Sequence, residues 1–235
     1  MIPQSSGKIY LSHERGITQE GNDHRSYHTF NFGSYYHEHK EAIGNLLFLN
    51  DDTLNMGVHM KTFVKQGTSL LLLPIVGGLK YKSETSGEIS GFVEAGRICL
   101  LKPDAAIEVE ISNPYTTELV NFLQIGINLA LDHLHYSIGE FDLESHPDCL
   151  LPLLFSGEGK TKYNLGSIGK FGGRTSGNYP VGNPAAGVFA FVIDGVFEVQ
   201  DRLLQSRDGL ALWDVQEVEF EALSQEAIIL FLEMT

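Results

Sequence analysis

The sequence is poor in basic residues and contains no long apolar run. Its 235 residues include 16 Lys and Arg against 30 Asp and Glu, which gives a formal net charge of -14. Proteins that bind nucleic acid neutralise phosphates with clustered Lys and Arg, so we expect no direct binding to nucleic acid or to an anionic membrane. The longest strongly apolar run, residues 70–76, is far too short to cross a bilayer.

Cysteine is scarce as well. Cys99 and Cys149 stand far apart and form no CxxC pair. A disulfide framework uses more cysteines in a shorter chain, so both residues are predicted to be free thiols in a reducing compartment. The first residues lack the apolar core of a signal peptide, and we therefore expect a cytoplasmic protein.

Short apolar or alternating runs, broken by Gly, Pro, Asn and Asp, dominate the chain and predict strands joined by turns. The expected strands cover residues 53–63, 69–76, 79–82, 98–102, 107–111 and 119–127. Helical patterns are rare, and short helices are expected only near residues 34–41 and 129–136. Residues 152–183 hold much of the glycine and predict loops or edge strands.

Four sequence blocks recur in the same order in the two halves of the chain, which favours a duplicated β unit. The paired blocks are residues 73–81 and 191–199, 95–101 and 207–213, 107–111 and 218–222, and 121–125 and 230–234. We predict an all-β fold of two barrels in tandem. The first would span residues 1–130, and the second, with the Gly-rich connector, residues 131–235.

Several of these blocks resemble the pirin-like family of bicupins. Residues 25–36 read RSYHTFNFGSYY, residues 44–52 read GNLLFLNDD, residues 120–125 read VNFLQI and residues 207–214 read RDGLALWD. The resemblance implies two cupin barrels, each a jelly roll (double-stranded β-helix), with a metal in the N-terminal barrel. Some members resemble quercetin dioxygenases, and others look like regulators that bind a partner protein.

The metal ligands of this family are a His-x-His pair on one strand and a His-x-Glu pair near the end of the cupin. An ungapped count from Asn50 to Gly77 puts the first pair on Phe63 and Lys65, and the second falls on Glu108 and Glu110. Only Glu110 keeps the residue type of the family. With the imidazoles replaced, the resemblance implies no metal ligand set and no cofactor. His59 and Tyr81 lie near these positions.

Residues two apart on a strand share a face, so all four side chains at the ligand-equivalent positions are predicted to point into the first barrel. Two buried carboxylates without a cation repel each other. We therefore hypothesise that the ammonium group of Lys65 replaces the metal between Glu108 and Glu110. The alternative is that residues 107–111, IEVEI, form a strand with one wet face and that Lys65 is solvated.

These patterns favour a bicupin without the usual metal site that binds a small molecule or a protein partner and has no catalytic activity. The first alternative is a metal-dependent oxidoreductase of the quercetin 2,3-dioxygenase type with a divergent ligand set. The second is a structural homologue without a pocket, in which Phe63 fills the space of the metal. The family precedent predicts a monomer or a weak dimer.

Overall fold

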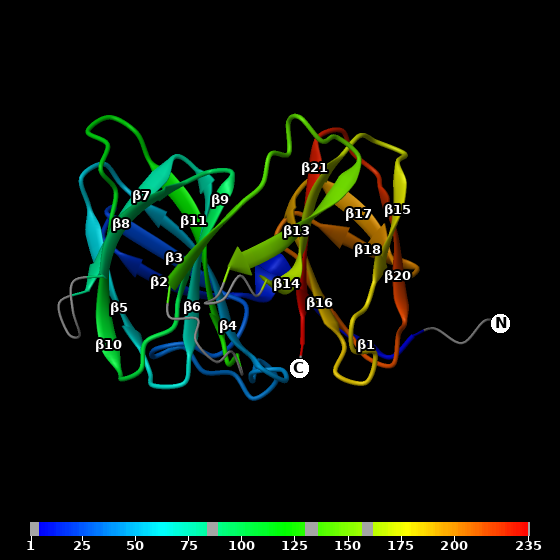
Figure 1. Cartoon of the computed structure of the whole chain (residues 1–235), viewed down its shortest axis with the longest axis horizontal. Helices are drawn as coiled ribbons and strands as arrows, with labels where there is room; N and C mark the ends of the chain where they lie inside the picture. Colours follow the sequence, from blue (N-terminus) through cyan, green and yellow to red (C-terminus); the bar gives the residue numbers. More distant parts are fainter. Residues whose placement is uncertain (1–4, 84–88, 130–135, 157–161, 235) are drawn as a thin grey trace. The chain divides into compact units, whose positions relative to one another are not determined.

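The computed structural model describes residues 5–83, 89–129, 136–156 and 162–234, and these residues form an almost entirely β structure (Figure 1). The one helix among them is the short 3-10 turn η1 (Ser12–Glu14). The strands form four antiparallel sheets, which belong to two compact units. No helix in the described ranges is long and apolar enough to cross a membrane.

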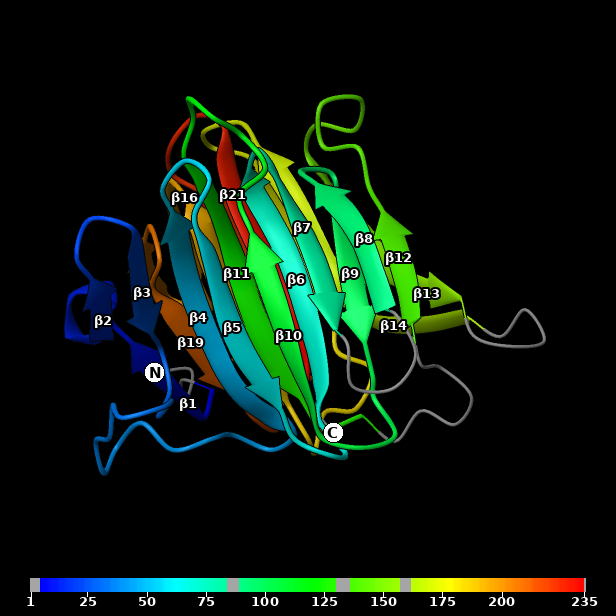
Figure 2. The same cartoon turned by 90° about the vertical axis from the view of Figure 1, so that its left-hand side faces the viewer.

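The first barrel is the unit that contains residues Gly16–Glu140 and Phe155–Tyr163. Its larger sheet has seven strands in the order β12 (Tyr136–Glu140), β9 (Arg97–Leu101), β6 (Ser69–Val76), β11 (Val120–Ile127), β4 (Leu46–Leu54), β3 (His24–His28) and β2 (Gly16–Glu20). Its smaller sheet has four strands in the order β5 (His59–Val64), β10 (Ile107–Ser112), β7 (Gly78–Ser83) and β8 (Ile89–Glu94). These strands face the viewer in Figure 2. Alternate apolar residues of both sheets, such as Leu72, Val109 and Phe122, form one core between them.

The second barrel is the unit that contains Met1–Arg15, Phe141–Leu154 and Asn164–Thr235. Its larger sheet has six strands in the order β1 (Gly7–Tyr10), β19 (Gly209–Leu212), β16 (Val188–Asp194), β21 (Ala227–Glu233), β14 (Lys162–Phe171) and β13 (Cys149–Ser156). Its smaller sheet has four strands in the order β15 (Ser176–Pro180), β20 (Glu217–Ala222), β17 (Val196–Val199) and β18 (Arg202–Gln205). The core of this barrel is rich in aromatic rings, which pack edge to face or stacked: Phe171, Tyr179, Phe197, Phe220 and Phe231.

The two barrels repeat one topology, so the predicted duplication is confirmed. The strand order β9-β6-β11 in the first barrel corresponds to β19-β16-β21 in the second, and β5-β10-β7-β8 corresponds to β15-β20-β17-β18. Each pair of recurring sequence blocks lies on corresponding strands. Gly77 and Gly195 directly follow the corresponding strands β6 and β16. Their φ angles are 76° and 80°, a conformation that glycine adopts without strain.

Three expectations about the chain need correction. The division into units differs from a boundary at residue 130, because β1 pairs with β19 and completes the edge of the second barrel. Residues 34–41 form turns rather than a helix, with Phe32 and Tyr35 in an isolated bridge. Most of the other expected helix, residues 130–135, lies outside the described residues.

The third correction concerns the Gly-rich stretch, which contains β14, a strand inside the six-stranded sheet between β21 and β13. The high glycine content of this stretch predicted loops or edge strands, but Gly166 has a different role. A Cβ atom at this position would lie 1.9 Å from the carbonyl oxygen of Phe231 on β21. Glycine is therefore present because two backbones approach closely, and it does not mark a loop.

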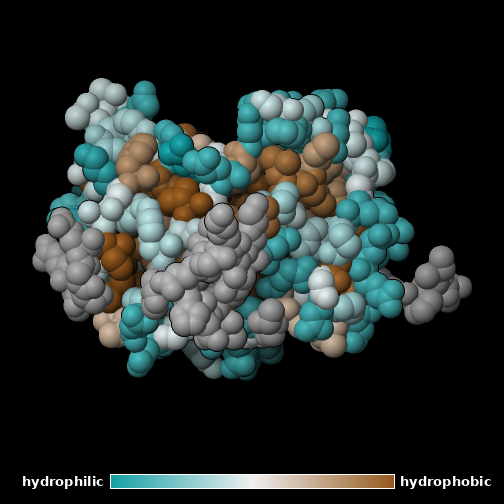
Figure 3. Space-filling view, in the orientation of Figure 1, coloured by the Kyte–Doolittle hydropathy of each residue, from teal (hydrophilic) through white to brown (hydrophobic). Residues whose placement is uncertain are grey.

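The surface has a mixed character. Hydrophilic side chains predominate on the face in Figure 3, with hydrophobic patches between them.

Both cysteines are free: Cys99 is buried in the first barrel, and Cys149 is exposed. The prediction of free thiols is confirmed.

Candidate functional site

Strands β5 and β10 lie side by side and bring the two predicted ligand pairs together. Phe63 stands directly opposite Glu108, and Lys61 stands opposite Glu110. The side chains of both strands alternate between the barrel interior and solvent. A residue of β5 or β10 can therefore contribute to a site inside the barrel only if its side chain lies on the inner face.

The predicted residues share the outer face. Phe63 is 61% exposed, and Lys65 is also exposed. Glu108 accepts a hydrogen bond of 2.6 Å from the Lys61 ammonium, with both side chains more than half exposed. Glu110 forms an ion pair of 3.1 Å with Lys82 on β7.

The interpretation that Phe63, Lys65, Glu108 and Glu110 face the barrel interior is therefore wrong. The strand with one wet face, the alternative considered from the sequence, describes β10 correctly. The carboxylates are balanced by surface lysines, and no buried cation is needed. Phe63 does not fill the barrel either.

His59 and Tyr81, which were expected near the ligand-equivalent positions, lie in different environments. His59 is exposed at the start of β5, on the same outer face as Lys61. Tyr81 is buried in the core of the first barrel, and its hydroxyl lies 2.7 Å from that of Tyr136. Burial and the hydrogen bond to Tyr136 raise the pKa of the Tyr81 phenol far above its usual range.

The inner face of β5 and β10 is almost entirely apolar. Six residues form it, and only one, a threonine, carries a polar side-chain oxygen: Met60, Thr62, Val64, Ile107, Val109 and Ile111. The two strands to which the ligand pairs were assigned thus present no imidazole and no carboxylate to the interior.

The polar centre of the first barrel lies instead on the seven-stranded sheet. Asp52 on β4 is completely buried and accepts hydrogen bonds from His24 Nε2 at 2.9 Å and from Gln124 Nε2 at 2.7 Å. These residues share the inner face with Leu54 and Phe122, which belong to the barrel core. Sequence reasoning missed this network, although three consecutive polar residues at 50–52 in a buried strand were a usable signal.

A second polar pair continues this network along the same face. The imidazole of His28, with Nδ1 protonated, donates to Asn50 Oδ1 at 2.8 Å, and its Nε2 accepts from the Thr18 hydroxyl at 2.9 Å. His28 and Asn50 stand opposite each other on β3 and β4. The interior of this barrel thus carries a connected row of polar groups on one sheet and apolar groups on the other.

The comparisons with known proteins agree with this architecture. Residues 167–234 match the family model of the quercetinase C-terminal cupin domain. Over 230 residues the chain is 25% identical to quercetin 2,3-dioxygenase of Escherichia coli (strain K12), covering 95% of this chain and 97% of that protein. The crystal structure of YhhW from Escherichia coli matches with a TM-score of 0.82 at 21% identity, covering 97% of each chain. The chain therefore has the bicupin fold and is similar to the pirin-like family.

A further solved structure with this fold is a nickel complex. The bacterial pirin YhhW from Escherichia coli in complex with nickel(II) matches with a TM-score of 0.79 at 20% identity, covering 97% of this chain and 99% of that chain. Imidazole and carboxylate groups are the side chains that suit nickel, iron and manganese. The inner face of β5 and β10 in this bicupin has neither, so its residues do not fit such a metal. Among the described residues no group of three or more His, Cys, Asp or Glu is placed to hold a metal ion.

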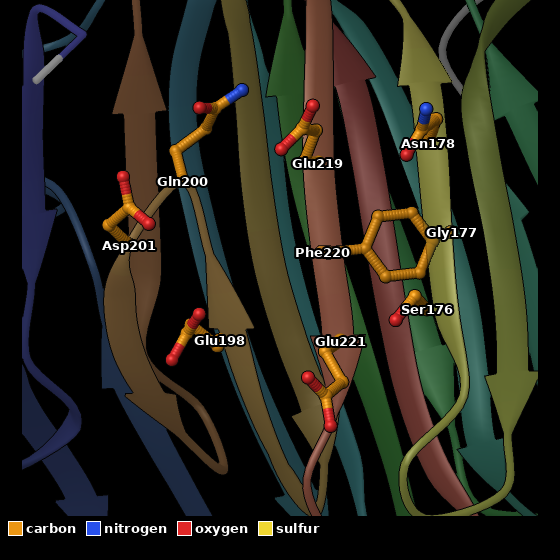
Figure 4. Close-up of a pocket in the computed structure, with 9 residues that line it drawn as sticks. All are labelled: Ser176, Gly177, Asn178, Glu198, Gln200, Asp201, Glu219, Phe220 and Glu221. Atoms are coloured by element: carbon orange, nitrogen blue, oxygen red, sulfur yellow. The ribbon is translucent and has the colours of Figure 1, made fainter. Parts of the chain in front are cut away.

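The bicupin also has an acidic surface pocket of about 220 Å³ on the outer face of β15, β20 and β17 (Figure 4). Four carboxylates line it, from Glu198, Asp201, Glu219 and Glu221. Glu221 approaches Arg174 at 3.5 Å. A group of surface carboxylates is usually a solvated face, so we assign no binding role to this pocket.

The assignment of faces on β10 can be tested by neighbouring substitutions. Glu108→Gln is expected to change the free energy of unfolding by less than about 1 kcal/mol, because the ion pair with Lys61 is exposed to solvent. Val109→Ala removes completely buried methyl groups and is expected to cost about 2 kcal/mol. Urea denaturation of both variants measures the difference. A larger loss for Glu108→Gln than for Val109→Ala would show that the faces are reversed.

The two thiols are expected to react very differently. Burial raises the pKa of the Cys99 thiol to about 12, so at pH 8 it is protonated as well as inaccessible. Cys149 is exposed. A thiol-specific chromogenic reagent should therefore label one thiol per native chain within minutes and two thiols in denaturant. Rapid labelling of both in the native protein would contradict the burial of Cys99.

Proposed function

We propose that this bicupin is a non-catalytic binding protein for a small molecule or a protein partner, and that its first barrel has lost the metal centre of the family. The observation that carries the proposal is the inner face of β5 and β10. In the place of imidazoles and a carboxylate it presents methyl groups, one thioether and one hydroxyl. Such a surface cannot hold a redox metal.

The competing function is a quercetin 2,3-dioxygenase activity, which the name of the Escherichia coli relative suggests. Dioxygenation in this family depends on a bound metal, as the resemblance implies. The apolar inner face of β5 and β10 argues against this activity. The polar groups of the first barrel lie instead around Asp52, where they form hydrogen bonds with one another. We also propose a cytoplasmic monomer or weak dimer, in keeping with the acidic, cysteine-poor chain.

Metal content and oxygen consumption test this proposal together. The purified bicupin is incubated with nickel(II), iron(II) or manganese(II), desalted and analysed by mass spectrometry of the metals, and oxygen uptake is then followed with quercetin. The Escherichia coli quercetin 2,3-dioxygenase, treated in parallel, is the positive control. We expect far less than one metal per chain and no oxygen uptake above the protein-free rate.

Quercetin-dependent oxygen uptake would overturn the proposal, and so would a stoichiometric metal that survives desalting and does not depend on the surface histidines His37 and His39. The variant His37→Ala/His39→Ala serves as a control for adventitious binding, because these two exposed imidazoles lie 5.6 Å apart between ring centres. A metal that disappears in this variant is bound at the surface and leaves the proposal intact. A metal that remains identifies a centre elsewhere in the chain.

A further inference from the structure

The first barrel has a surface pocket of about 220 Å³ at the turn between β2 and β3. The turn forms it together with the end of β4 and the residue before β11. Seven of the nine residues that line it have polar side chains, and the other two are Gly21 and Leu119. Pockets for drug-sized ligands measure roughly 300–1,000 Å³, so this pocket suits a smaller and more polar molecule.

His24 connects this pocket with the buried polar network. The residue lines the pocket, but its side chain is only 9% exposed, and its Nε2 lies 2.9 Å from the buried Asp52 carboxylate. An ionised carboxylate can only accept, so Nε2 carries the proton and Nδ1 of the neutral ring is an acceptor. Within the ranges that the structure describes, Nδ1 has no hydrogen-bond partner. The pocket thus contains a largely buried acceptor whose orientation Asp52 fixes.

Hydrogen bonds hold the turn in place around this imidazole. The backbone amide of Asp23 donates to the carbonyl oxygen of Glu20 at 3.1 Å. The backbone amide of Asn55 donates to the carbonyl oxygen of Asp23 at 2.8 Å, which ties the turn to the end of β4. Gln19 Nε2 donates to the carbonyl oxygen of Gly21 at 2.7 Å. A ligand therefore meets a formed pocket and need not order the turn.

The charges of the pocket favour a neutral ligand. Asp23 and Arg25 both line it, and among the described residues neither forms an ion pair. One carboxylate and one guanidinium together favour neither an anion nor a cation. A hydroxyl group donates and accepts at once, so several hydroxyls can donate to His24 Nδ1 and to Asp23 and accept from the Asn22 amide. Leu119, which is 55% exposed, offers an apolar surface to C–H groups.

We propose that the pocket at the β2–β3 turn binds a neutral polyhydroxylated molecule of the size of a single sugar ring, with one hydroxyl on His24 Nδ1. This inference rests on the proposed binding function and gives it a site and a ligand class. The site lies at the surface of the first barrel and uses none of the residues at the ligand-equivalent positions 63, 65, 108 and 110.

D-Glucose, D-galactose, D-mannose and D-ribose are the probes. Each is titrated into ¹⁵N-labelled bicupin, and the ring nitrogens of His24 and the backbone amides of residues 22–25 are followed by NMR. We expect at least one sugar to shift these signals to saturation. Asp23→Ala removes a charged acceptor and should raise the half-saturating concentration about tenfold. Glu219→Ala removes a carboxylate from the pocket on the second barrel and should leave the titration unchanged.

Signals that stay in place or drift without saturation in all four sugars overturn the inference, and so does an unchanged half-saturating concentration in Asp23→Ala. Asn22→Ala tests the same site if Asp23→Ala disturbs the turn, and it should weaken binding as well. Glycine is titrated as a zwitterion whose two charges Asp23 and Arg25 would hold. Saturation by glycine and by none of the sugars overturns the inference too.

Metal analysis of the same samples separates the two proposals. A metal-free, inert bicupin that binds none of the sugars rejects the sugar site alone. A stoichiometric metal that does not depend on His37 and His39, or quercetin-dependent oxygen uptake, rejects the proposed function.

Discussion

Gly166→Ala is expected to destabilise the second barrel by about 4 kcal/mol or more. Gly166 has a φ angle of 145°, and an added Cβ would lie 1.9 Å from the backbone oxygen of Phe231. The neighbouring atom belongs to the backbone of a paired strand, so it cannot rotate away as a side chain could. The pairing of β14 with β21 must open, and the cost combines backbone strain with overpacking.

Trp213 provides the measurement, because it is the single tryptophan of the chain and belongs to the second barrel. Its fluorescence is followed through a urea titration of the native protein and the variant. Gly172→Ala is the matched control, since its new Cβ would come no closer than 3.6 Å to another atom. We expect this control to stay within about 1 kcal/mol of the native protein. Equal midpoints for the two variants would contradict the close approach at Gly166.

Local pattern and duplication predicted two β barrels in tandem, and the resemblance to the pirin-like family predicted that both are cupin barrels. The recurring blocks lie on corresponding strands of the two barrels. Each strand of the jelly roll imposes its own alternation of apolar residues, and corresponding strands therefore have similar sequences. The segments that were predicted wrongly are those whose structure depends on a contact with a residue far away in the sequence. Gly166 is required by Phe231, 65 positions away in a chain that offers no local sign of the contact, and β1 lies in a barrel whose other strands come from the far end of the chain.

The site was harder to predict, because neighbouring residues on a strand point to opposite faces. An alignment error of one residue therefore moves a whole set of side chains from the interior to solvent. The count that placed Phe63 and Lys65 ran to Gly77 through β6, where the register with β11 shifts between Pro74 and Val76. Such irregularities do not preserve the face. The alternation of Ile107, Val109 and Ile111 alone would have assigned β10 correctly.

The polar network could not be derived from spacing at all. His24, Asp52 and Gln124 lie on three strands that the sheet topology brings together, in the order β11-β4-β3. Each residue has an ordinary structural explanation when it is taken alone. Only their pairing shows that Asp52 is a buried carboxylate with two partners.

His24→Ala is therefore expected to destabilise the first barrel by about 3 kcal/mol or more. The substitution removes one of two donors to Asp52, which has no exposed surface. A buried carboxylate that loses a partner keeps its desolvation cost without the compensating hydrogen bond. The loss is measured by the labelling of Cys99, which lies in the core of the same barrel and becomes reactive when that barrel unfolds.

A double-mutant cycle with Asp52→Asn separates this interaction from the general cost of truncating a buried side chain. Once the carboxylate is replaced by a neutral amide, the imidazole no longer compensates a charge. His24→Ala should then cost about 2 kcal/mol less in the Asp52→Asn background than in the native protein. Additive effects within about 0.5 kcal/mol would show that His24 stabilises the barrel by packing alone. The contacts of the network would then be independent of one another, and of the two donors to Asp52 only Gln124 would stabilise its carboxylate.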